Sequence, residues 1–82
     1  MAKADDIRQY CKAKCLEARR KGDKTITFCS GDVHKALNLN SSLPAVCAAI
    51  GADEFERMCN VTRLCVDGPL NGSTTLFVFK LL

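Results

Sequence analysis

The sequence predicts a small α+β domain whose elements follow the order helix, strand, helix, helix, strand, strand (αβααββ). Apolar residues recur three or four positions apart over residues 4–21, which is the period of a helix with one buried face. Residues 24–29 and 74–81 are rich in β-branched and aromatic side chains, as strands are, and residues 24–29 also alternate in polarity. A polar turn over residues 38–44 separates two further helical segments.

Composition places the chain among globular proteins. The chain has 82 residues, of which 48% are hydrophobic and 26% charged, so it suits a single domain with one core spanning residues 1–82. Residues 1–6 are too polar for a signal peptide, and no apolar run is long enough to cross a bilayer. We therefore expect a soluble, cytoplasmic protein without a membrane partner.

The first helix is predicted over residues 4–21 by an apolar stripe. Its members are Ile7, Cys11, Cys15 and Ala18. Asp5 suits the positive amino end of this helix, the basic run at residues 19–21 suits its carboxyl end, and Gly22 can end it in the left-handed conformation. A strand follows over residues 24–29, with Ile26 and Phe28 facing inward.

Two compact helices are predicted next. Ser30 or Asp32 can cap the first of them, which buries Val33 and Leu37. The second begins near Pro44, and its buried positions are Val46, Ala49 and Ile50. Gly51 ends or kinks this helix. We expect a turn after Asp53 in which the apolar side chains pack on the core, namely Phe55, Met58 and Cys59.

The tail reads as a hairpin, with strands over residues 61–66 and 74–81 joined by a turn-rich loop at residues 67–73. The last strand is apolar on both faces: Phe77 and Phe79 point one way, Leu76 and Val78 the other. Because so small a domain has one core, the second face needs another cover. The sequence thus predicts a homodimer formed through the terminal hairpin.

The six cysteines are interpreted as reduced thiols, most of them shielded, because nothing indicates an oxidising compartment and their spacing follows core faces. A structural zinc site is the alternative, but the cysteine spacing lacks the close loop pairs that such sites use. Catalysis is also disfavoured. His34, the only histidine, falls inside a short helix as a surface or cap residue, and no nucleophile or metalloprotease motif accompanies it. We expect neither an enzyme nor a required cofactor or metal.

Residues 32–50 resemble a helix-turn-helix, and the whole chain resembles the winged helix-turn-helix superfamily. That resemblance implies a duplex DNA partner and a role in transcription regulation. Basic residues near the first helix, with one on the second, would attract phosphate: Arg19, Arg20, Lys21, Lys24 and Lys35. The exposed start of the recognition helix would be formed by Asn38, Asn40, Ser41 and Ser42, and the wing would contribute Asn71, Ser73 and Thr74.

Residues 43–52 depart from that pattern, because they contain no Arg, Lys, Gln or Asn to read base edges. The basic run at residues 19–21 also has a second interpretation, as electrostatic stabilisation of the helix end. Two functions therefore stay open at this point. One is a DNA-binding or regulatory module, and the other is a protein-interaction or adaptor module that uses the same fold without binding DNA.

Overall fold

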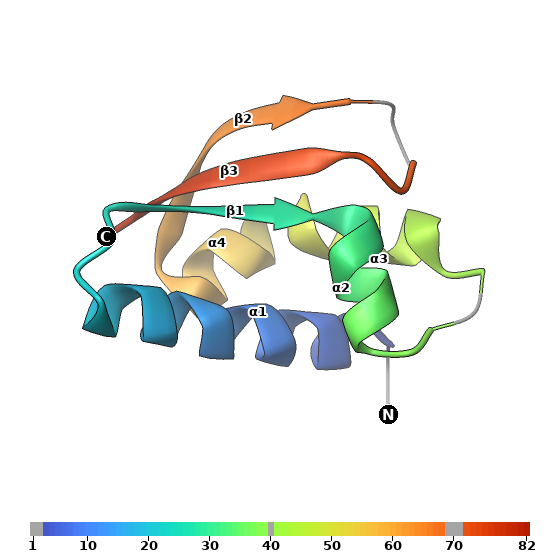
Figure 1. The fold of residues 1–82 in the computed structure, drawn as a ribbon, viewed down its shortest axis with the longest axis horizontal. Coiled ribbons are helices and arrows are strands. Elements are labelled where there is room, and N and C mark those ends of the chain that lie inside the picture. Colours follow the sequence, from blue (N-terminus) through green and yellow to red (C-terminus); the bar gives the residue numbers. More distant parts are fainter. Residues whose placement is uncertain (1–2, 40, 69–71) are drawn as a thin grey trace.

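The computed structural model describes residues 3–39, 41–68 and 72–82, which form a small α+β fold with four helices on one side of a three-stranded antiparallel sheet (Figure 1). The elements are α1 (Lys3–Arg20), β1 (Thr25–Cys29), α2 (Ser30–Ala36), α3 (Leu43–Ile50), α4 (Asp53–Cys59), β2 (Val61–Asp67) and β3 (Leu76–Leu81). The strand order is β1-β3-β2, so the last strand lies in the centre. The predicted α+β class is confirmed.

Helix α4 corrects the predicted order, since residues 53–59 were expected to form only a turn. Phe55 and Cys59 lie four residues apart and are both buried, so a helical turn places them on one face toward the core. Asp53 begins the helix at its positive end, and Asn60 ends it with a left-handed φ of 57°. The observed order is therefore αβαααββ.

The core lies between α1 and the sheet, as the stripe on the first helix predicts. Ile7, Cys11 and Cys15 are all completely buried. Phe55 of α4 contacts Phe79 of β3 with ring centroids 4.9 Å apart, so the unpredicted helix supplies a central aromatic side chain.

The two hairpin strands differ in burial. β3 alternates, with Phe77 and Phe79 buried against the helices, whereas in β2 only Val61 is buried. The pairing of β2 with β3 shifts register between Arg63 and Cys65. The helices all lie on one side of the sheet, and no described element covers its other face (Figure 1).

Among the described residues, no helix combines the length and the apolar character that a transmembrane span needs.

Candidate interaction surface

The predicted nucleic-acid-binding residues fall into two groups that the structure keeps apart (Figure 1). Residues 19–24 lie where α1 ends, whereas the α2–α3 connection and the described part of the β2–β3 connection lie near the opposite end of the fold. Helix α1 runs between these ends, and its 18 residues span about 27 Å at the usual helical rise. The two groups therefore form no joint site.

Arg19 is committed to the protein backbone. Its Nη2 donates to the carbonyl oxygens of Cys59 and Asn60, each at 2.6 Å, and its Nε donates to the carbonyl of Leu82 at 3.4 Å. These bonds join the end of α1 to the end of α4 and to the residue that follows β3. The side chain thus has a structural role, whereas its predicted neighbours remain exposed, namely Arg20, Lys21 and Lys24.

The α2–α3 connection differs in one respect from the predicted exposed start of a recognition helix. Asn38 and Ser41 are exposed and have left-handed φ values of 53° and 47°. Ser42 is 2% exposed, and its backbone N–H donates to Nε2 of His34 at 3.2 Å. Its position corrects the prediction, because the connection folds back on α2. Lys35 is exposed on α2, and the predicted residue Asn40 lies outside the described residues.

The described part of the predicted wing is held against the start of α2. The backbone N–H of Ser30 donates to the carbonyl of Thr75 at 2.9 Å, and that of Gly31 donates to the carbonyl of Ser73 at 3.0 Å. A Cβ at Gly31 would overlap the Ser73 carbonyl oxygen, so glycine permits this approach. Ser73 and Thr74 are exposed. The predicted residue Asn71 lies outside the described residues.

Helix α3 presents a narrow apolar surface. Half of the helix is buried: Val46, Cys47, Ala49 and Ile50. Its exposed side chains are Pro44 and Ala48, and no residue of the helix carries a charge or a side-chain amide. At the position that the resemblance assigns to base reading, the chain therefore has no side-chain hydrogen-bond donor of the kind that contacts base edges.

A groove of about 420 Å³, which we call the α3–β2 groove, lies between the second half of α3 and the hairpin. Its lining residues are Cys47, Ala48, Gly51, Arg63, Val66, Thr75 and Phe77. Phe77 is 4% exposed and belongs to the floor, whereas Val66 on β2 is 46% exposed. The groove is thus apolar along most of its lining and has one charged residue.

Arg63 is the charged residue of this groove and is held from two sides. Its Nη1 donates to the carbonyl of Gly51 at 2.8 Å, at the end of α3. Its backbone N–H donates to Oε1 of Glu56 at 2.8 Å, which links β2 to α4. The first bond places the guanidinium at the carboxyl end of α3, and the second holds the backbone of β2 at Arg63.

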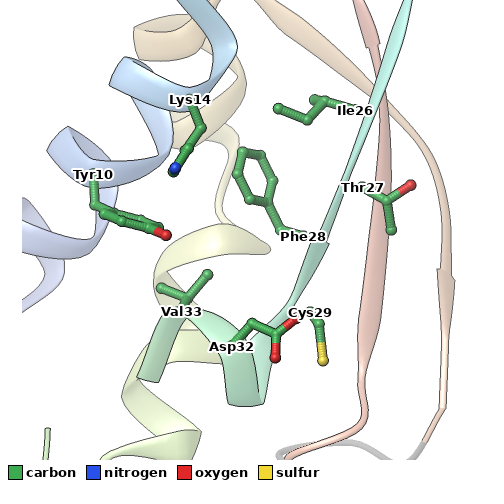
Figure 2. Close-up of a pocket in the computed structure, with 8 residues that line it drawn as sticks. All are labelled: Tyr10, Lys14, Ile26, Thr27, Phe28, Cys29, Asp32 and Val33. Atoms are coloured by element: carbon green, nitrogen blue, oxygen red, sulfur yellow. The ribbon is translucent and has the colours of Figure 1, made fainter. Parts of the chain in front are cut away.

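A second hollow, of about 220 Å³, lies between α1, β1 and α2 (Figure 2). Lys14 and Tyr10 project from α1 toward Phe28, and the Nζ of Lys14 is 5.6 Å from the centre of the Tyr10 ring. Asp32 and Val33 border the hollow from α2. Its volume is below the range of about 300–1,000 Å³ that small-molecule sites usually have, so we regard the α3–β2 groove as the better candidate.

Buried thiols from α1 and α4 form a separate cluster. Burial raises the pKa of Cys11 to about 12, with a smaller contribution from Cys59. A hydrogen bond between the thiols of Cys15 and Cys59 raises the pKa of Cys15 and lowers that of Cys59. All six cysteines are free thiols. In the described part of the chain, no group of three or more His, Cys, Asp or Glu residues is arranged to hold a metal ion.

Comparison with protein-family models, with curated proteins and with solved structures finds no match for this chain. The candidate site consequently rests on the geometry of the α3–β2 groove. Sequence reasoning missed this groove, although one signal was present. Arg63 interrupts an otherwise neutral strand over residues 61–66, whose remaining members are apolar or small.

Proposed function

We propose that this chain is a winged-helix-like protein-interaction module that binds a segment of a partner protein in the α3–β2 groove. The observation that carries the proposal is the apolar groove at the junction of α3 with the hairpin. In the winged-helix resemblance, the corresponding helix and wing would contact DNA. The strand order β1-β3-β2 and the hydrogen bonds between the start of α2 and the β2–β3 connection support the resemblance.

The charge distribution favours a protein partner over duplex DNA. Phosphate binding needs cations on the contacting surface, but α3 has none, and α4, the next element, begins with the exposed acidic residues Asp53 and Glu54. The exposed cations Arg20 and Lys24 lie near the other end of α1. Duplex DNA binding is the competing function, and the experiment below includes a result that would support it.

The dimensions of the groove suit a peptide side chain. A volume of about 420 Å³ lies within the range of sites that enclose much of a bound group. Partner binding would cover the exposed part of Val66 and the Ala48 methyl group, and burial of apolar surface contributes about 25 cal/mol per Å² before the costs of association. An apolar anchor in a groove of this kind is a common form of interaction hot spot.

Selection of peptides displayed on phage against the full chain tests the proposal. We expect enriched peptides with an apolar anchor, and their binding should weaken at least about tenfold in Ala48→Gln, because the longer side chain fills the groove. Ala13→Gln is the matched control, since Ala13 is an exposed alanine of α1. It should bind like the parent protein.

The same proteins should be titrated with labelled duplex DNA at low and at physiological salt. Failure to select any peptide whose binding depends on Ala48 would contradict the proposed function. Salt-dependent DNA binding that is unchanged in Ala48→Gln but weakened in Lys24→Gln would favour the nucleic-acid alternative instead.

A further inference from the structure

We propose that the partner segment bound in the α3–β2 groove carries a carboxylate next to its apolar anchor, and that the guanidinium of Arg63 binds this carboxylate. The inference rests on the proposed function, and it specifies the chemistry of the partner. It follows from the place of one fixed cation beside an otherwise neutral, largely apolar groove.

The guanidinium of Arg63 is held in position before a partner binds. Its bond to the carbonyl of Gly51 uses Nη1, and the described contacts of the side chain include no other hydrogen bond. A guanidinium is a planar fork of N–H donors that pairs with a carboxylate through two parallel hydrogen bonds. Because Arg63 is already ordered by α3, binding would lose little side-chain entropy.

The charge of Arg63 is not neutralised inside the groove. None of the lining residues is acidic, and Arg63 has no ion pair among the described residues. The carboxylate of Glu56 contacts the backbone N–H of Arg63, not its guanidinium. Glu56 lines a different hollow, which it shares with Asp53 and Asn60. The groove side of Arg63 therefore favours an anionic group supplied by another molecule.

The neutral residues of the groove define the rest of the partner segment. Phe77 and Cys47 are almost completely buried, and Ala48 lies at the open side. An aliphatic or aromatic side chain placed over them would exclude water from the adjacent ion pair, which strengthens charge-assisted hydrogen bonds. Nucleic acid phosphate fits this surface poorly, because it offers an anion without the apolar anchor.

The peptides selected on the parent protein provide the test, with Asp or Glu expected next to the apolar anchor. In a selected peptide, replacing the acidic residue by its amide should weaken binding to the parent protein by about 10- to 100-fold, the usual worth of a charged hydrogen bond. The same replacement should have little effect on binding to Arg63→Met, while Arg63→Lys should retain part of the preference for the acid.

Combining the peptide replacement with the Arg63 variants distinguishes a failure of this inference from a failure of the proposed function. Peptides that need Ala48 but show no acidic preference would overturn the role of Arg63 and leave the protein-interaction proposal standing. Equal losses from the amide replacement on the parent protein and on Arg63→Met would also overturn it. Absence of any groove-dependent peptide would contradict both. Arg63→Met leaves the carbonyl of Gly51 without its hydrogen-bond donor and could fail to fold. In that case the amide replacement is compared on the parent protein and on Arg63→Lys. A smaller loss on Arg63→Lys would support the role of the guanidinium, and equal losses would contradict it.

Discussion

His34 Nε2 accepts a hydrogen bond from the backbone N–H of Ser42 at 3.2 Å, across the whole connection between α2 and α3. The bond requires a neutral imidazole that carries its proton on Nδ1. It satisfies the N–H of the residue that precedes the first turn of α3, where helix N–H groups lack partners within the helix. His34 is thus a cap supplied from a neighbouring helix, and the connection can follow a compact path through left-handed Asn38 and Ser41.

Removal of this acceptor should destabilise the fold. We expect His34→Ala to lower the free energy of unfolding by about 1–2 kcal/mol, because a part-buried N–H loses its partner. Lys35→Ala is the matched control, since Lys35 is the exposed next residue of α2, and it should change stability by less than about 0.5 kcal/mol. Urea unfolding followed by circular dichroism measures both. Equal stabilities of the two variants would show that the cap is energetically unimportant.

The carbonyl bonds of Arg19 lead to a second prediction. Arg19→Met keeps most of the aliphatic stem but leaves the carbonyls of Cys59 and Asn60 without the donor that they have at 2.6 Å. We expect a loss of about 2–3 kcal/mol in the free energy of unfolding. The exposed neighbour provides the comparison, and Arg20→Met should stay within about 0.5 kcal/mol of the parent protein. A larger loss in Arg20→Met would argue against the assigned roles.

Arg19 shows how far the sequence could predict the structure. The α1 stripe, the strands and the helix pair follow from local periodicity, and they were found at close to their predicted positions. The role of Arg19 could not be predicted, because its acceptors lie 40 and 41 residues further along the chain. From the sequence, a basic run at a helix end is compatible with electrostatic stabilisation of that end and with phosphate contact. Only the long-range contacts of the folded chain show which of the two roles Arg19 has.

The candidate site was also only partly visible in the sequence. The lack of polar residues over 43–52 indicated that α3 suits a protein partner. The groove itself depends on the register shift near Arg63 and on the packing of α3 beside β2, neither of which has a local signature. Helix α4 was missed because the sequence marks its start weakly, since the residue before its first turn is Ala52 and alanine is a poor N-cap residue.

Thiol accessibility provides a third prediction. Cys65 is exposed and Cys29 is partly exposed, whereas the other cysteines are buried: Cys11, Cys15, Cys47 and Cys59. We expect one thiol to react rapidly in the native protein, one slowly, and the buried group only after denaturation. Ellman's reagent with stopped-flow detection measures these classes, and Cys65→Ser should remove the rapid one. Rapid reaction of more thiols in Cys65→Ser would contradict the described burial.

The raised pKa of Cys11 gives a pH-dependent prediction. The native state holds this thiol proton more tightly than the unfolded chain, since the pKa rises from 9.0 to about 12. The stabilising contribution is therefore complete below pH 9 and is lost as the pH rises toward 12. In that window, the free energy of unfolding of the parent protein should fall more steeply than that of Cys11→Ala. The difference should approach about 1.4 kcal/mol per pH unit, and parallel pH profiles would rule it out.

Self-association through the hairpin stays a prediction, and the structure specifies where it would occur. Val78 and its register neighbours Thr27 and Cys65 lie on a sheet face that no described helix covers, because α1 packs on the other face. Leu64 is 53% exposed and Leu76 is 37% exposed. At the free edge of β2, however, the N–H of Arg63 is occupied by Glu56. This contact opposes pairing of edges, so a dimer would form face to face.

Analytical ultracentrifugation over a range of concentrations tests this arrangement. We expect a dimer that Val78→Lys dissociates without unfolding the protein, because an outward lysine places a charge in the apolar contact. Leu16→Lys is the matched control, since Leu16 is 50% exposed on α1, away from the sheet, and it should leave the dimer intact. A parent protein that is monomeric at high concentration would exclude the face-to-face dimer. The α3–β2 groove lies on the helix side of the sheet, so peptide binding should survive Val78→Lys, and the two surfaces can be tested independently.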